Sequence, residues 1–206
     1  MNTVELSNRI YPDITRTPED YEAMYTKRNL PEGAKVTRLG PSPTGFIHLG
    51  NLYGAFVDER LAHQSEGIFY LRIEDTDDKR YVENAVETII SSLAFFGIQF
   101  DEGVTAHGDV GDYGDYTQSH RGEIYRCYAK KLIAEGKAYP CFLSEEEISE
   151  IREKQEELKI APGIYGEWSR YRDWETDEVL QKEVAERLER GDDFVIRLKS
   201  SGVPNA

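Results

Sequence analysis

The chain has 206 residues, of which 39% are hydrophobic and 31% are charged, and its formal net charge at pH 7 is −14. No apolar run approaches the roughly 20 residues that a membrane-spanning helix needs, and the polar N-terminus lacks the apolar core of a signal peptide, so we expect no membrane partner. The acidic balance counts against a domain that holds RNA mainly by charge, and the interpretation that these residues alone bind no RNA stays open.

Residues 1–34 precede the first predicted strand and are expected to form an N-terminal extension. The run Thr17-Pro18-Glu19-Asp20 supplies a capping hydroxyl, a proline and two acids, an order that is typical of the start of a helix. We therefore predict a helix from about Pro18 to Lys27. The sequence indicates no function for the extension, which we expect to wrap around the outer face of the fold.

Residues 35–65 are predicted to form a strand, a loop and a helix. Lys35 to Leu39 fits a short strand, and Asn51 to Ser65 fits a helix whose apolar residues recur near the 3.6-residue period. Its predicted apolar stripe consists of Leu52, Ala55, Phe56 and Leu61. Pro41 and Pro43 restrict the path of the intervening loop.

The loop has several features of an anion site. Gly45 and Gly50 have no Cβ, so a ligand can approach the backbone closely. The unpaired N–H groups and the positive dipole end of the following helix face the loop, and His48 stands at this entry with a ring free to donate to a phosphate. The sequence matches neither of the two familiar phosphate loops, G-x-G-x-x-G and Gly-Lys-Ser/Thr. From spacing alone, an ordinary glycine-bearing turn and a phosphate site fit equally well.

Residues 68–97 repeat the pattern of strand and helix. A largely apolar strand from Ile68 to Ile73, expected to have helices on both faces, precedes a helix from Tyr81 to Phe96. The predicted apolar side of that helix consists of Val82, Ala85, Ile89, Leu93 and Phe96. Alternating strands and helices predict an α/β fold with a parallel sheet and right-handed crossovers. Ligands of such sheets bind at the carboxyl ends of the strands, so the loops 40–51 and 74–80 should face one crevice.

The segment that follows is predicted to be a loop and then a helix. Residues 98–117 are rich in Gly and Asp, but the acids lack the spacing of a calcium-binding EF-hand. Ser119 is predicted to cap a helix that runs to about Glu135 and ends at Gly136. The predicted apolar side of this helix consists of Tyr125, Tyr128, Leu132 and Ile133.

Cys127 and Cys141 show neither disulfide nor Cys-x-x-Cys spacing. We therefore expect a reducing, cytoplasmic location. A lone cysteine near residue 141 is weak evidence for a tetrahedral zinc site, so we predict no zinc and expect Cys141 to pack as a small hydrophobic residue.

The C-terminal part is predicted to alternate short strands with charged helices. Strands are expected at Ala138–Phe142 and Phe194–Lys199, and helices at 145–159 and Asp177–Arg190, the first of them begun by a capping box at Ser144. Acid concentrates in residues 145–157 and 173–189, which we expect to be solvated helix faces. Tyr165, Trp168 and Tyr171 could stack on bases, but such aromatic residues are more often core residues, and we favour that role.

Three motifs together carry a family resemblance. They are the run Arg38-Leu39-Gly40-Pro41-Ser42-Pro43-Thr44-Gly45-Phe46-Ile47-His48-Leu49-Gly50-Asn51, the run Ile73-Glu74-Asp75-Thr76-Asp77, and the run Tyr116-Thr117-Gln118-Ser119-His120-Arg121. Their order and spacing resemble those of class I glutamyl-tRNA synthetases from about Val36 to Leu198, where the element at His48 is the HIGH motif. The resemblance implies an N-terminal fragment. It would hold an extension (1–34), the first half of a Rossmann-type parallel sheet (35–115) and an incomplete α+β acceptor-binding insertion (116–206).

The resemblance also implies a reaction, the ATP-dependent ligation of glutamate to tRNA-Glu through glutamyl-adenylate. His48 would be the catalytic residue and would contact ATP together with Gly45, Gly50 and Asn51. Arg38 and Ser42 would hold the glutamate carboxylate, and Glu74 would accept from its ammonium group. A simple Arg38–Glu74 ion pair stays open as the alternative. Tyr116, Gln118 and Arg121 would begin the platform for the tRNA acceptor end, while Asp75, Asp77 and Arg80 would form a supporting network.

By the same resemblance, Mg²⁺ would arrive with ATP, and tRNA-Glu would be held mostly by parts of the protein outside these residues. Many relatives carry a zinc site near residue 141, and this chain departs from that pattern. Glutaminyl-tRNA synthetase is the nearest competing interpretation, although Pro41–Gly45 and Ile73–Asp77 favour glutamate. A shorter paralogue that glutamylates a tRNA base stays open, and so does a non-catalytic module that binds ATP or an amino acid. The choice between tRNA-Glu and tRNA-Gln is not readable from these residues.

Overall fold

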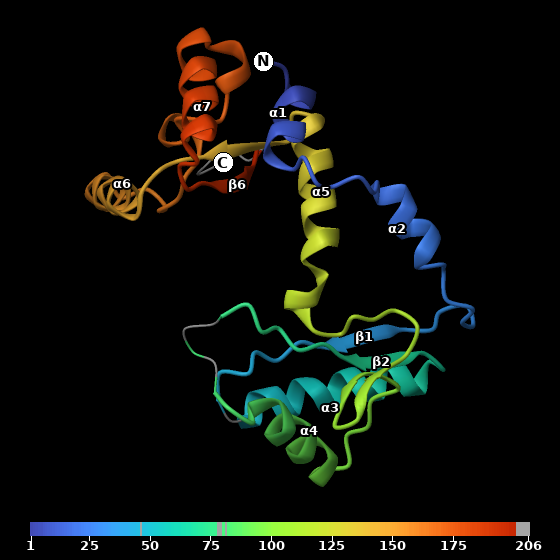
Figure 1. Ribbon diagram of the computed structural model, residues 1–206. Coiled ribbons are helices and arrows are strands. Elements are labelled where there is room, and N and C mark those ends of the chain that lie inside the picture. Colours follow the sequence, from blue (N-terminus) through green and yellow to red (C-terminus); the bar gives the residue numbers. More distant parts are fainter. Residues whose placement is uncertain (46, 78–79, 81, 201–206) are drawn as a thin grey trace. The chain divides into compact units, whose positions relative to one another are not determined.

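The computed structural model describes residues 1–45, 47–77, 80 and 82–200. The chain packs as two compact units (Figure 1). We call Glu19–Ile124 the four-stranded unit and Met1–Pro18 with Tyr125–Ala206 the two-stranded unit. The functional boundaries predicted near residues 34 and 115 remain predictions, because packing units and functional domains need not coincide.

The four-stranded unit contains a mostly parallel sheet. Its strands are β1 (Val36–Leu39), β2 (Ile68–Leu71), β3 (Glu102–Thr105) and β4 (Gly108–Val110), in the order β1-β2-β3-β4. β1, β2 and β3 are parallel, whereas β4 returns antiparallel to β3. The predicted parallel α/β sheet is confirmed. The prediction of a loop over 98–117 was wrong, because β3 and β4 form through backbone pairing despite their Gly and Asp content.

Two helices cover one face of this sheet (Figure 1), namely α3 (Leu49–Gln64) and α4 (Ala85–Phe95). The buried cluster between helices and sheet consists of Leu39, Ala55, Ala62, Phe69, Leu71, Ile73, Ile89, Leu93 and Ile98. Helix α4 begins later than predicted, and its expected apolar residues Val82 and Phe96 are exposed. The buried cluster therefore uses the middle of the predicted helix and not its ends.

The predicted apolar stripe of α3 was partly wrong. Phe56 and Leu61 are about half exposed, whereas Ala55, Glu59 and Ala62 are buried. Glu59 accepts a hydrogen bond from the backbone N–H of Gln99 at 2.9 Å, so a charged residue occupies the inner face. The small alanines let the helix approach the sheet closely. Because Glu59 lies between them, the inner face is not a continuous apolar stripe and could not be recognised from the sequence.

β2 is not covered by helices on both faces within the described residues, contrary to expectation. Phe69 and Leu71 are buried under the helices, whereas Tyr70 and Arg72 alternate onto the other face and stay partly exposed. That face holds a pocket of about 310 Å³. Its lining consists of Tyr25, Arg28, Val36, Tyr70, Arg72, Tyr113, Tyr116 and Arg121.

The N-terminal segment is divided between the units. Helix α2 (Pro18–Met24) starts where predicted and ends three residues earlier. Helix α1 (Thr3–Ile10), which begins with a capping box formed by Asn2 and Glu5, was not predicted. Leu6 of α1 is fully buried in the core of the two-stranded unit, so this part of the extension is not an outer wrap.

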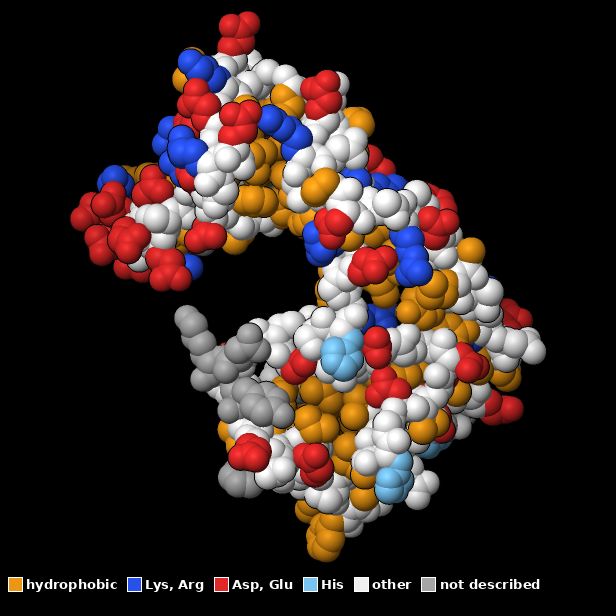
Figure 2. Space-filling view, in the orientation of Figure 1, with side chains coloured by type: hydrophobic (Ala, Val, Ile, Leu, Met, Phe, Trp, Pro, Cys, Tyr) orange, Lys and Arg blue, Asp and Glu red, His pale blue; other side chains and the backbone are white. Residues whose placement is uncertain are grey.

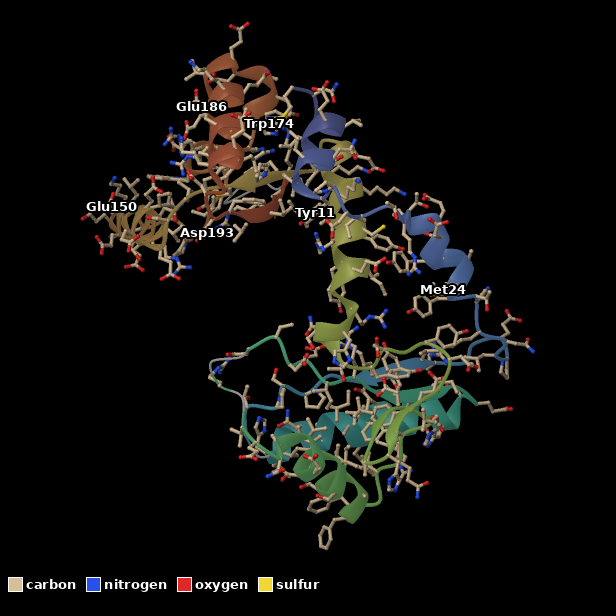
Figure 3. All side chains as sticks on the ribbon, in the orientation of Figure 1. Tyr11, Met24, Glu150, Trp174, Glu186 and Asp193 are labelled. Atoms are coloured by element: carbon tan, nitrogen blue, oxygen red, sulfur yellow. The ribbon has the colours of Figure 1, made fainter. Side chains whose placement is uncertain are left out.

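The two-stranded unit is built around an antiparallel pair, β5 (Ala138–Cys141) and β6 (Val195–Leu198), as the sequence predicted. Besides α1, its described helices are α5 (Gly122–Ala134, from residue 125 on), α6 (Glu145–Glu157) and α7 (Glu178–Arg190), with the 3-10 turns η3 (Gly166–Trp168) and η4 (Trp174–Thr176). Trp174, labelled in Figure 3, is fully buried. Tyr171 and Cys141 are also buried, which confirms the core roles expected for them, whereas Tyr165 and Trp168, also expected in the core, stay partly exposed.

Helix α5 differs from its prediction. A 3-10 turn, η2 (Gln118–Arg121), precedes it, and Ser119 does not cap it. Tyr125 and Tyr128 are exposed, whereas Cys127 and Ile133 are buried. The long tyrosines are amphipathic and tolerate solvent, so the smaller residues occupy the inner face.

The acidic helices α6 and α7 are solvated, as predicted. Figure 2 shows acidic side chains gathered over α6, and Glu150 and Glu186 project from their helices in Figure 3. The α6 capping box, in which Ser144 and Glu147 satisfy each other's backbone N–H, is confirmed. Among the described residues, no helix has the length and apolar character needed to cross a membrane.

Candidate active site

The loop after β1 leads directly into α3, and His48 is the N-cap of that helix. The ring Nδ1 of His48 accepts the backbone N–H of Gly50 at 3.1 Å, and the Asn51 side chain accepts the backbone N–H of His48 at 3.2 Å. A neutral imidazole that accepts at Nδ1 carries its proton on Nε2. The cap therefore assigns the donor role to Nε2. The sequence had predicted a ring that is free to donate, without indicating which nitrogen donates.

A pocket of about 360 Å³ lies at this helix N-terminus. Its lining consists of Gly40, Pro41, Ser42, Thr44, Gly45, Ile47, His48, Asn51 and Ile89. None of these described lining residues is an acid, and the positive end of the helix dipole is adjacent, so the pocket favours an anion. Four predicted ligand contacts, Ser42, Gly45, His48 and Asn51, are brought together here.

Gly50 belongs to the helix start but not to the pocket lining. A Cβ at Gly50 would lie 3.0 Å from Cε1 of His48, so the absent side chain leaves room for the capping ring. The N–H of Gly50 is already bound by that ring. The structure therefore gives Gly50 a role in holding His48.

Arg38, at the end of β1, forms an ion pair with Glu74, which follows β2. Nη2 of Arg72 also donates to Glu74, at 3.0 Å. The simple ion pair considered as the alternative from sequence is thus present. Partial burial raises the pKa of Glu74, but the hydrogen bonds from Arg72 and Arg38 outweigh it, and the pKa is lowered overall. The carboxylate is ionised, and two guanidinium groups share it.

Gly40 is a site residue that the sequence analysis missed. A Cβ at this position would lie 2.6 Å from Oε1 of Glu74 and 2.7 Å from Nη1 of Arg38. Any side chain here would displace the ion pair. The only sequence signal was a glycine between the strand and the two prolines, and such a glycine is common in turns.

The loops after β1 and β2 meet, as the parallel topology predicted. The backbone N–H of Glu74 donates to the carbonyl of Pro41 at 2.9 Å. Asp75 accepts from Ser119 twice, from its N–H at 2.9 Å and from its hydroxyl at 2.6 Å. Nε of Arg80 donates to Asp77 at 2.6 Å. These contacts have the character of the supporting network expected for Asp75, Asp77 and Arg80.

The third motif runs beside the second. Ile73 donates its N–H to the carbonyl of Tyr116, and Gln118 donates to the carbonyl of Ile73, both at 2.9 Å. Arg121 donates through Nη1 to the carbonyl of Asp115 at 2.9 Å. The two bonds of Ile73 tie the third motif to the segment that carries Glu74, and the bond of Arg121 holds the third motif to the residue just before it.

Tyr116 is only 2% exposed, and its hydroxyl donates to Glu102 at 2.7 Å. Burial, together with the hydrogen bond to Glu102, raises the pKa of Tyr116 to about 12. The ring thus lies inside the fold, and its hydroxyl is engaged with a carboxylate. Contact between Tyr116, Gln118 or Arg121 and a tRNA remains a prediction.

Among the described residues, no group of three His, Cys, Asp or Glu side chains is arranged to hold a metal ion. The pocket lining offers hydroxyl, imidazole, amide and backbone groups. Its chemistry is that of a site for an anionic organic ligand.

Comparison with known proteins agrees with this geometry. A family model for the catalytic domain of class I tRNA synthetases (E and Q) matches residues 35–203. The glutamate–tRNA ligase of Acetivibrio thermocellus is 57% identical over 205 residues, which cover 99% of this chain and 37% of that protein. The match includes residues 1–34, so the N-terminal segment has a counterpart in this relative.

Solved structures give the same result. The glutamate-tRNA synthetase of Elizabethkingia anophelis matches with a TM-score of 0.69 and 36% identity, over 81% of this chain and 33% of that chain. A glutamate tRNA ligase of Elizabethkingia meningosepticum, solved in complex with its amino acid, matches with a TM-score of 0.68 and 37% identity, over 82% of this chain and 32% of that chain. The chain thus spans about a third of the length of these relatives. Because the family model covers most of it, the chain belongs to the class I tRNA synthetases (E and Q) and contains sequence of their catalytic domain.

Proposed function

We propose that the protein ligates glutamate to tRNA-Glu at the expense of ATP, through a glutamyl-adenylate. The observation that carries the proposal is the pairing of two subsites in one unit. An acid-free pocket lies at the N-terminus of α3, and the Arg38–Glu74 pair lies beside its Gly40 wall. The first suits phosphate, and the second suits the two charges of an amino acid.

In the first step, a carboxylate oxygen of glutamate attacks the α-phosphorus of ATP. The bond from phosphorus to the bridging oxygen breaks, and pyrophosphate leaves with the electron pair. No covalent bond to the protein forms, so the residues act by positioning and by stabilising charge. We assign His48 to this role, because its Nε2–H can donate to a phosphate oxygen while Nδ1 remains the helix cap.

ATP would be held by Gly45, His48 and Asn51 around the start of α3, and Gly50 would contribute by holding the ring of His48. Gly45 has no heavy atom within 4 Å of the position that a Cβ would take, so a ligand can approach its backbone. Asn51 is both a lining residue and a partner of the His48 backbone. The set combines backbone donors with one imidazole donor.

Glutamate would be held by Arg38, Ser42 and Glu74. The substrate carboxylate would take the guanidinium of Arg38, and the substrate ammonium would take Glu74. Glu74 keeps Arg72 as a partner at 3.0 Å, so Arg38 can turn to a ligand without leaving a lone carboxylate. The shared ion pair is therefore suited to exchange for a substrate that carries both charges.

In the second step, a terminal ribose hydroxyl of the tRNA attacks the glutamyl carbonyl, and AMP leaves. Gln118 and Arg121, with Tyr116 beneath them, would begin the platform for this end of the tRNA. The net charge of −14 supports a division in which most tRNA contacts come from other parts of the full-length protein.

Mg²⁺ would accompany ATP and neutralise charge on its phosphates. Mg²⁺ prefers carboxylates together with substrate phosphates, and the described pocket lining offers no carboxylate. The ion would therefore be held by the nucleotide itself. A cytoplasmic location is also proposed, supported by the two buried cysteines, neither of which forms a disulfide in the described part of the chain.

The experiment is aminoacylation of tRNA-Glu by the full-length protein, with glutamate and glutamine compared as substrates. We expect charging with glutamate and a rate at least about a hundredfold lower with glutamine, because the relatives that match are glutamate ligases. The 206-residue chain alone should not charge tRNA. Preferential charging with glutamine, or no charging with either amino acid, would contradict the proposal.

A further inference from the structure

We propose that residues 25–28, in the N-terminal segment, position the glutamate subsite. We call these residues the brace. They would act through the loop at 113–119 on the backbone that carries Glu74. The inference rests on the proposed function, and it assigns a role to a segment for which the sequence indicated none.

The first step of the brace joins it to the loop. Tyr25 donates its hydroxyl to the carbonyl of Gly114 at 2.9 Å, and Tyr113 donates its hydroxyl to the carbonyl of Thr26 at 2.7 Å. The rings of Tyr25 and Tyr113 are stacked with centroids 6.4 Å apart. Two reciprocal hydrogen bonds and one ring contact thus fix the loop against the N-terminal segment.

The second step is a partly buried ion pair. Arg28 binds both carboxylate oxygens of Glu102 on β3, and Nη2 lies 2.6 Å from Oε2. The guanidinium also lies over the ring of Tyr113, 3.7 Å from its centroid. Only 17% of the Arg28 side chain and 12% of the Glu102 side chain are exposed. A bidentate pair of this burial is strong and geometrically restrictive.

The third step connects this ion pair to Tyr116. Oε2 of Glu102 accepts both from Arg28 and from the hydroxyl of Tyr116. That hydroxyl in turn accepts the N–H of Tyr113 at 3.1 Å. One carboxylate thereby couples the brace to the residue that begins the third motif.

The last step reaches the subsite from both sides of Glu74. The carbonyl of Tyr116 accepts the N–H of Ile73, and Ser119 donates twice to Asp75. Ile73 and Asp75 are the two chain neighbours of Glu74. The brace therefore ends on the residues that fix the direction of the Glu74 side chain, although it contacts none of the residues proposed to hold glutamate or ATP.

A second observation separates the brace from general packing. The members of the buried cluster of the four-stranded unit come from β1, α3, β2, α4 and the segments just after β2 (Ile73) and just after α4, and none comes from residues 25–28. The contacts of the brace are hydrogen bonds, an ion pair and ring stacking. Interactions of this kind fix geometry more than they add to the free energy of folding.

The test uses Arg28→Ala, Arg28→Lys and Tyr25→Phe in the full-length protein. The matched control is Arg60→Ala, because Arg60 also pairs with a buried carboxylate, Glu59, and lies over an aromatic ring. Arg60 is not in the chain of contacts that leads to Glu74. The measurement is the KM for glutamate and for ATP in pyrophosphate exchange with tRNA-Glu present, together with the melting temperature.

For Arg28→Ala we expect the KM for glutamate to rise about tenfold, while the KM for ATP changes by less than about twofold. Arg28→Lys should restore part of the loss, because it keeps the charge but not the bidentate geometry. Tyr25→Phe should give a smaller rise in the same parameter. Arg60→Ala should leave both KM values unchanged. An unchanged KM for glutamate, or equal rises for glutamate and ATP, would overturn the inference.

A second readout does not depend on activity. In Arg28→Ala, hydrogen exchange of the amides of Ile73, Gln118 and Ser119 should accelerate at least about tenfold, whereas Arg60→Ala should leave it unchanged. Unchanged exchange at these amides would refute the coupling even in an inactive protein. If the wild-type protein showed no activity, the proposed function would be contradicted. The hydrogen-exchange measurement would then still test the brace by itself.

Discussion

His48 is proposed to do two things with two nitrogens, and substitution can separate them. Nδ1 caps helix α3 by accepting from Gly50, while Nε2 is the proposed donor to a phosphate of ATP. His48→Asn keeps a side-chain oxygen that can cap the helix but removes the distal donor. His48→Ala removes both.

The two losses have different sizes and different readouts. A lost N-cap costs about 0.5–2 kcal/mol of the free energy of unfolding. A lost hydrogen bond to a charged group costs about 1.5–3 kcal/mol, which corresponds to a rate about tenfold to 150-fold lower. His48→Asn should therefore lose rate but little stability, whereas His48→Ala should lose both.

The assay is glutamate-dependent pyrophosphate exchange with tRNA-Glu, measured beside urea unfolding of each variant. The KM for glutamate should change little in either variant, because the proposed glutamate contacts come from Arg38, Ser42 and Glu74. If His48→Asn kept the wild-type rate, Nε2 would have no role in the reaction. If His48→Ala were as stable as the wild type, the capping contact would contribute nothing to the free energy of unfolding.

Glycine packing, core burial and titration each yield a further prediction. Gly40→Ala should raise the KM for glutamate by displacing the ion pair beside it, while the control Gly54→Ala, in open space within α3, should leave kinetics unchanged and add up to about 1 kcal/mol of stability. Leu71→Ala, at a fully buried position, should cost about 2–5 kcal/mol in denaturant unfolding, and a loss below about 1 kcal/mol would contradict the core assignment. Glu102 has its pKa lowered from 4.5, mainly by the hydrogen bond from Arg28, and Tyr116 has its pKa raised from 10.0 to about 12. As the pH falls, Glu102 takes up a proton in the unfolded chain before it does so in the folded protein, which lowers the stability. As the pH rises, Tyr116 loses its proton in the unfolded chain before it does so in the folded protein, which also lowers the stability. The melting temperature should therefore fall at both acid and alkaline pH. Glu102→Gln should remove the acid-side effect and only reduce the alkaline one, because burial, the larger cause of the raised pKa of Tyr116, remains; an unchanged pH profile in that variant would contradict this origin.

The elements that the sequence predicted well are those with strong local signals. β1, β2, β5 and β6 are short apolar or alternating runs, and the helices after Ser144 and Asp177 start with capping residues that the structure uses. These signals act within a few residues, so a single sequence contains them. The parallel order of β1 and β2 followed from the intervening helix.

The failures share a physical cause, namely contacts between residues distant in sequence. The inner face of α3 includes Glu59, which is buried only because the backbone of Gln99 satisfies it. β3 and β4 depend on pairing with β2 and with each other, and their own residues favour a loop. Serine is a common helix-capping residue, but the N–H and the hydroxyl of Ser119 donate to the carboxylate of Asp75 instead.

The candidate site shows the same division. An anion site at the loop before α3 was one of two interpretations that Gly45, Gly50 and the helix start allowed equally, and a pocket lies there. The sequence could not show that the ring of His48 caps the helix. It also could not show that Gly40 makes room for the ion pair between Arg38 and Glu74, which are 36 positions apart in the chain. Both facts depend on three-dimensional packing around single atoms.

The most direct test of the central claim is glutamate-dependent exchange of labelled pyrophosphate into ATP by the full-length protein, with tRNA-Glu present. Formation of glutamyl-adenylate predicts exchange that requires glutamate and that falls at least about tenfold in His48→Asn. Binding of ATP and glutamate without any exchange would contradict the claim, and the site would then be a binding module and not an active site.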